Sequence, residues 1–73
     1  MAHERIVCDP AIMLGKPVIR DTRLTVEHIL RELSGGASIE ELLREYPGLT
    51  AEDVRAAQAY AADYLAGDQS VFG

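Results

Sequence analysis

Hydrophobic residues recur at helical spacing in two neighbouring stretches in the middle of the chain. In each stretch the apolar residues fall at i, i+3, i+4 and i+7, which places them on one face of a helix. The first set is Val26, Ile29, Leu30 and Leu33, and the second is Ile39, Leu42, Leu43 and Tyr46. We therefore expect two short amphipathic helices, one after the other.

The residues that flank these stretches supply start and stop signals for both helices. Thr25 is a good N-terminal cap for the first helix, and Gly35 and Gly36 end it because glycine closes a helix without strain. Ser38 and Glu41 have the spacing of a capping box at the start of the second helix. Pro47-Gly48 ends that helix after Tyr46.

A third helix is predicted from Thr50 to about Ala66. Its apolar positions form a narrow stripe of small residues with larger ones toward its ends: Val54, Ala57, Ala61, Tyr64 and Leu65. Gln58 lies at the edge of this stripe, so we expect either a buried hydrogen-bond partner for its amide or an exposed edge. The tight link from the second helix gives the outline of a helix-turn-helix.

The segment before the helices contains short β-prone runs. Arg5–Cys8 is one, and Pro17–Arg20 and Arg23–Val26 flank Asp21-Thr22 as in a hairpin. The predicted fold is mainly α: a short N-terminal β-hairpin arm at 5–26, a three-helix helix-turn-helix bundle at 26–66 and a tail at 67–73, in a single domain spanning 1–73.

The small size of the chain predicts self-association. A domain of 73 residues has a marginal core, and the single Cys8 excludes an intrachain disulfide. We expect a homodimer or higher homo-oligomer, with Val18, Leu24, Tyr60 and Tyr64 at the interface. Cys8 itself is interpreted as a small buried residue. Without a signal segment or a long apolar run, the sequence predicts a soluble cytoplasmic protein with no membrane partner.

Charge is distributed unevenly along the chain. The net charge is −5, yet residues 5–23 carry four basic and two acidic side chains, a local balance of +2. The candidate residues for binding a partner or DNA are therefore Lys16, Arg20, Thr22 and Arg23 of the arm. The third helix begins with Ala51-Glu52-Asp53, which makes it a poor reader of the DNA major groove because phosphates repel carboxylates.

The chain offers little chemistry of an enzyme. His28 and Glu32 are spaced i, i+4, as metal ligands can be, but the sequence provides no recognisable third ligand and no nucleophile with a base. His3 lies near the terminus without a partner close in sequence. We predict a non-catalytic protein without metal or cofactor.

The motifs GKPVIRDTRLTVEHIL and GGASIEELLREYPGLTAEDVRAA, followed by Ala59-Tyr60-Ala61, resemble the bacterial and archaeal family called domain of unknown function 433. The resemblance extends from about Ile6 to Leu65. It implies a winged or homeodomain-like helix-turn-helix fold and, because many members are encoded beside a PIN-like nuclease, the antitoxin half of a toxin-antitoxin pair. Two residues depart from the family pattern, Asp21 in place of Gly and Gln58 in place of Leu.

Two functions follow as hypotheses. The first is an antitoxin-like binding protein that neutralises a PIN-like nuclease, with Arg20 and Arg23 as the inserted residues, and that also regulates its own operon. The alternative is a homodimeric helix-turn-helix DNA-binding transcriptional regulator without a toxin partner. The hairpin arginines serve either function, so the residues alone leave both open.

Overall fold

The computed structural model of the chain describes residues 3–68, with three helices and two short strands in that range. The strands are β1 (Ile6–Val7) and β2 (Val18–Ile19), and a single 3-10 turn, η1 (Met13–Gly15), lies between them. The helices are α1 (Val26–Ser34), α2 (Ile39–Glu45) and α3 (Ala51–Asp68). The predicted order of a hairpin arm followed by three helices is confirmed.

The arm is a two-stranded antiparallel sheet in which Ile6 lies opposite Ile19 and Val7 opposite Val18. The predicted turn at Asp21-Thr22 also forms, since the Thr22 N–H donates to the Ile19 carbonyl at 3.0 Å and the Ile19 N–H donates to the Leu24 carbonyl at 2.9 Å. β2 therefore lies between β1 and the chain that leads into α1. Asp21 has a φ of 65°, so it adopts the left-handed conformation that the glycine of the family pattern would adopt freely.

The predicted caps of the first two helices are present. The Thr25 hydroxyl accepts the His28 N–H at 3.0 Å, and Gly36, with a φ of 107°, follows the end of α1. Ser38 and Glu41 form the complete capping box of α2. α3 runs two residues beyond the predicted end at Ala66, and the Val71-Phe72 part of the predicted tail lies outside the described residues.

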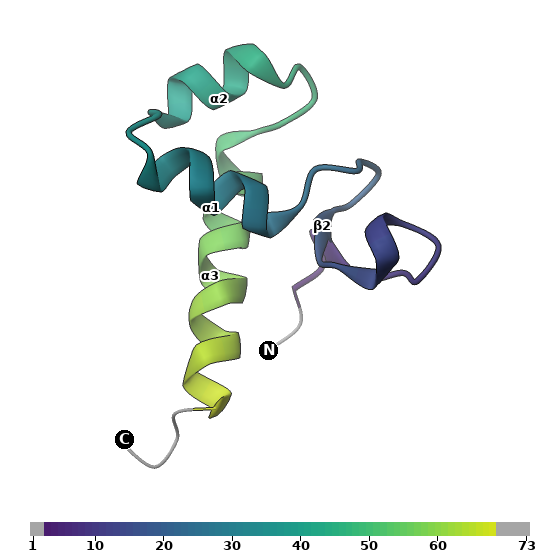
Figure 1. Ribbon diagram of the computed structural model, residues 1–73. Coiled ribbons are helices and arrows are strands. Elements are labelled where there is room, and N and C mark those ends of the chain that lie inside the picture. Colours follow the sequence, from purple (N-terminus) through teal and green to yellow (C-terminus); the bar gives the residue numbers. More distant parts are fainter. Residues whose placement is uncertain (1–2, 69–73) are drawn as a thin grey trace.

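The core lies where α1 and α2 pack on the first half of α3, and α3 then extends past α1 (Figure 1). The buried apolar side chains come from the arm, all three helices and the turn before α3: Ile6, Val18, Ile19, Val26, Ile29, Leu42, Leu49, Val54 and Ala57. Gln58 is exposed, so of the two alternatives predicted for it the exposed edge is correct and the buried hydrogen-bond partner is not. Within residues 3–68, the second half of α3 is largely exposed, including Tyr64 and Leu65.

A charged contact fixes the arm to the start of α3. Arg5 donates to Asp53 Oδ1 and to Glu52 Oε1, both at 3.0 Å, across 48 and 47 residues of chain. Asp53 is buried and also forms a capping box with Thr50. The Thr50 N–H donates to the Asp53 carboxylate, and the Asp53 N–H donates to the Thr50 hydroxyl. The two acids from which we predicted that α3 reads DNA poorly therefore anchor the arm to α3.

Candidate functional site

The turn between β2 and α1 presents two arginines to solvent from a fixed base. Val18 and Ile19 are 1% and 2% exposed, so the strand that leads into the turn is anchored in the core. Arg20 and Arg23 are both exposed, one on each side of the two turn residues. The turn thus fixes where the two side chains leave the backbone, and a guanidinium group can bind a carboxylate or phosphate through two parallel hydrogen bonds.

The contacts of the two arginines differ. Arg20 Nε donates to the Glu4 carbonyl at 2.6 Å, which orients its guanidinium group and leaves the terminal nitrogens available. For Arg23 there is no hydrogen bond or ion pair to any of residues 3–68. Arg23 is therefore the more available cation of the turn.

Thr22, predicted as a binding residue, has a structural task instead. Its hydroxyl donates to the Ile19 carbonyl at 2.7 Å and accepts the Leu24 N–H at 3.0 Å, and the residue is half-buried. These bonds close the turn that separates Arg20 from Arg23. Thr22 thus shapes the binding turn, and the proton of its hydroxyl is already used within the chain.

Surface hollows lie on both sides of the turn and share Thr22 and Arg23. One has a volume of about 690 Å³ and is lined by Val7, Ile12, Val18, Arg20, Asp21, Thr22 and Arg23. The other, of about 440 Å³, is lined mainly by apolar groups of Leu24, the 46–48 turn and Leu49. A partner that binds the arginines therefore also meets apolar surface on either side of them.

Lys16, the remaining predicted cation, lies away from this turn. Its Nζ is 3.2 Å from Glu27 Oε1 on α1, and Arg31 binds the other oxygen of Glu27. The hydrogen bond from Lys16, followed by that from Arg31, lowers the pKa of Glu27. The structure thus brings Arg20 and Arg23 together and pairs Lys16 with α1.

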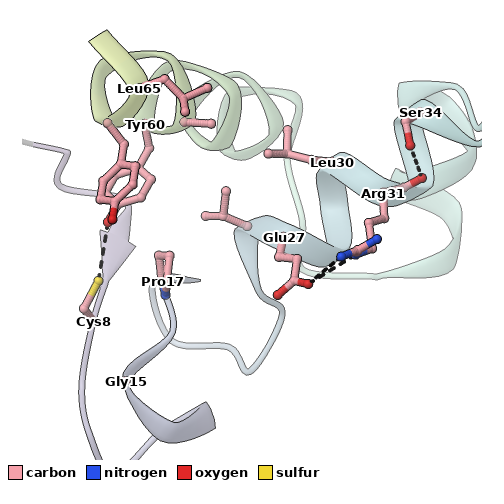
Figure 2. A pocket seen from close by; sticks show the side chains of 12 residues that line it. Cys8, Gly15, Pro17, Glu27, Leu30, Arg31, Ser34, Tyr60 and Leu65 are labelled. Carbon is pink, nitrogen blue, oxygen red and sulfur yellow. Dashed lines mark hydrogen bonds and ion pairs between the residues drawn. The ribbon is translucent and has the colours of Figure 1, made fainter. Parts of the chain in front are cut away.

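A second candidate surface is an open groove between α1 and the second half of α3. Its volume is about 760 Å³, and Figure 2 shows Leu30 and Pro17 facing Tyr60 and Leu65 across it. Tyr64 and Leu65 also line it and are 65% and 58% exposed. The pattern of apolar residues predicted an apolar stripe on α3, but not that α1 would leave its second half open.

The groove changes the predicted dimer contacts. Tyr60 and Tyr64 lie on it, with their rings stacked at a centroid distance of 6.4 Å. Val18 is 1% exposed within the single chain, so it is a core residue and not an interface residue. Leu24 is half-buried and packs against the core near the arginine turn, away from Tyr60.

Cys8 and His3 are placed differently from their predictions. Cys8 is exposed at the edge of the groove, with its Sγ 3.7 Å from the Tyr60 hydroxyl, and this hydrogen bond followed by burial raises the pKa of Tyr60. His3 is not a free terminus: its Nε2 lies 2.9 Å from Asp63 Oδ2, and its ring meets Tyr60 edge-on. The arm therefore touches α3 at both the start and the middle of the helix.

Two absences concern metal and membrane binding. Within residues 3–68 no group of three or more His, Cys, Asp or Glu side chains is close enough to hold a metal ion. His28 instead lies 2.9 Å from the Tyr46 hydroxyl through its Nε2. None of the helices in the described part of the chain has the length and apolar character needed to span a membrane.

The fold and the turn define a small, mainly helical domain in which a β-hairpin arm is fixed across a three-helix bundle and presents paired arginines. The chain belongs to the family described as protein of unknown function (DUF433), whose model matches residues 6–61. The family resemblance read from the sequence is confirmed.

Two relatives support this assignment. The chain is 40% identical over 73 residues to Uncharacterized protein y4eO of Sinorhizobium fredii (strain NBRC 101917 / NGR234), a match that covers 99% of this chain and 33% of that protein. The chain thus spans about a third of the length of this relative. The crystal structure of a DUF433 member protein from Anabaena variabilis ATCC 29413 has a TM-score of 0.80 and 36% identity, covering 94% of this chain and 69% of that one.

Proposed function

We propose that this chain is a non-catalytic, antitoxin-like binding protein that neutralises a PIN-like nuclease by inserting Arg20 and Arg23 into the nuclease's acidic site. The supporting observation is the rigid turn, where two exposed arginines flank residues fixed by the buried Val18 and Ile19. A nuclease that binds metal ions through carboxylates offers the negative charge that a guanidinium group pairs with in two parallel hydrogen bonds.

The rest of the molecule suits this role. Its net charge is −5, so an acidic body can face the basic surface on which a nuclease binds RNA, while the turn enters the site itself. The hollows beside the turn supply apolar surface for the partner's rim. Family membership adds the expectation, drawn from the resemblance, of a nuclease encoded nearby.

The test is co-expression with the neighbouring reading frame, followed by a pull-down and an RNA-cleavage assay of any nuclease obtained. Arg23→Glu should weaken inhibition by about a hundredfold or more, because it places a carboxylate against carboxylates. Arg55→Glu is the matched control, since Arg55 is also exposed but lies on α3 away from the turn, and it should change inhibition by less than about threefold. If no nuclease-like neighbour forms a complex, or if both variants weaken inhibition equally, the proposal is wrong.

The alternative function is a homodimeric helix-turn-helix regulator that binds DNA, and the order of α1, α2 and α3 favours it. Because Glu52 and Asp53 stand at the start of α3, DNA would have to be bound by Arg20 and Arg23 of the arm. Affinity for the chain's own promoter should then fall steeply with added salt. The double change of Arg20 and Arg23 to Glu should abolish binding without altering helix content, and unchanged binding would exclude the arm as the DNA contact.

A further inference from the structure

The second half of α3 carries an apolar stripe that the rest of residues 3–68 leaves uncovered. Ala57, Ala61 and Leu65 follow one another at intervals of four residues on one face of the helix. Along this line Ala57 is 0% exposed, Ala61 is half-buried and Leu65 is 58% exposed. The stripe thus stays apolar as it passes from the core to the solvent-exposed part of the helix.

Helix dimensions explain why the stripe runs out of cover. α3 has 18 residues and is therefore about 27 Å long, whereas a helix that crosses it is about 10–12 Å wide. α1 packs on α3 at this crossing, and the remainder of α3 projects past it (Figure 1). The projecting half and the side of α1 that carries Leu30 form the two walls of the groove (Figure 2).

We infer that a second copy of this chain fills the groove, with the projecting half of each α3 lying in the groove of the other. In such a two-fold pair the same helix is both the wall of one groove and the occupant of the other, so the surface is complementary to itself. Tyr64 and Leu65 supply the apolar anchors of the inserted helix, and Leu30 and Tyr60 of the other copy receive them.

Charge favours this occupant. The end of α3 is the negative end of the helix dipole, its last turn contains no basic residue, and Asp63 lies on the projecting part. The α1 side of the groove carries Glu27 and Arg31 among its lining residues, and Lys16 and Arg31 both pair with Glu27, so this cluster has a net charge of +1. An acidic helix end therefore meets the basic rim, although two whole molecules of net charge −5 repel each other.

The size of the apolar surface sets the strength of the pair. Four large hydrophobic side chains are noticeably exposed among residues 3–68, and two of them, Tyr64 and Leu65, lie in the groove. A stable interface buries about 800 Å² per partner, which is more than two exposed side chains on each copy supply. The dimer should accordingly be weak, with a dissociation constant in the micromolar range.

The test is the oligomeric state of the full chain, measured by sedimentation velocity between about 1 μM and 1 mM. The mass should rise with concentration from 8.0 kDa toward twice that value. Ala61→Glu should raise the dimer dissociation constant by about a hundredfold or more, because each copy would place an unpaired carboxylate in an apolar interface. Ala62→Glu makes the same change one residue along, at an exposed position outside the groove, and should alter the constant by less than about threefold.

Leu65→Glu supplies a second perturbation at a more exposed position, and circular dichroism checks that each variant keeps its helices. It should also weaken the dimer by at least about tenfold. A monomer at every concentration would overturn the inference, whatever else covers the groove. Equal effects of Ala61→Glu and Ala62→Glu, or a dimer that Leu65→Glu leaves intact, would place any self-association elsewhere on the molecule.

Discussion

The attachment of the arm to α3 through Arg5 permits a quantitative prediction. The perturbation is Arg5→Met. Methionine keeps an unbranched stem like that of arginine but lacks the guanidinium group, so both charged hydrogen bonds, to Asp53 and to Glu52, are removed. Their surroundings differ, since the side chain of Asp53 is 9% exposed and that of Glu52 is 69% exposed. The two halves of the contact should therefore contribute unequally to the free energy of unfolding.

The magnitude follows from this difference in exposure. A hydrogen bond to a charged group contributes about 1.5–3 kcal/mol, and the lower end applies to Asp53 because the Arg5 side chain is 48% exposed and screened by water. The bond to Glu52 is a surface pair, for which about 0–0.5 kcal/mol is expected. In the variant Asp53 Oδ2 keeps the Thr50 N–H, whereas Asp53 Oδ1 loses its partner in a buried side chain, which adds to the cost. Arg5→Met should therefore cost at least about 1.5–2 kcal/mol in total.

The assay is urea unfolding followed by circular dichroism, at one fixed protein concentration because self-association would add to the apparent stability. In thermal unfolding a loss of about 1.5 kcal/mol lowers the midpoint by roughly 6–12 °C for a domain of this size. Glu52→Gln is the control and should change the free energy by no more than about 0.5 kcal/mol. The reasoning is refuted if Arg5→Met costs no more than Glu52→Gln.

Two further predictions concern the local devices of the fold. The backbone hydrogen bond from Ser38 lowers the pKa of Glu41. The stability that Glu41 adds as a capping residue is therefore complete above the ordinary glutamate pKa of about 4.3 and is lost as the pH falls through the lower pKa of the folded state. Glu41→Gln should make the urea midpoint less sensitive to acid, and an unchanged acid dependence would contradict this account. Thr22→Val keeps the shape of the side chain but removes both turn hydrogen bonds, and should cost about 1–2 kcal/mol in urea unfolding; a cost near zero would restore Thr22 as a candidate contact residue.

The helices could be predicted from the sequence because their signals are local. The apolar spacing of α1 and α2, the Thr25 cap and the Ser38–Glu41 capping box each lie within one helix, and each appears where the pattern placed it. The hairpin turn was also predicted, but the pairing of β2 with Ile6–Val7 was less evident, because it crosses about ten residues of irregular chain. Register over such a distance depends on tertiary packing.

The contacts between distant residues are what the sequence did not reveal. Nothing in the sequence near Cys8 indicates that its thiol would be exposed beside Tyr60. The partner of His3 is Asp63, which lies 60 residues away in the sequence. Val18 was predicted at a dimer interface because so small a domain has a marginal core, whereas in the structure the rest of the chain buries Val18 to 1% exposure. Spacing within a helix shows which face is apolar but not how far a neighbouring helix covers it, which is why the groove was missed.

The stretch from Gly15 to Val26 contributes to both candidate surfaces, in different parts of its length. Its two ends line the groove, through Gly15, Pro17 and Val26, while its middle carries the arginine turn. Pairing through the groove therefore leaves Arg20 and Arg23 of each copy outside the interface. A dimer would present two such turns, and a partner with two acidic sites would bind it more tightly than it binds a monomer through effective concentration. Ala61→Glu should accordingly weaken inhibition of a dimeric nuclease while leaving the contact of a single turn intact, whereas Arg23→Glu should abolish that contact in either state.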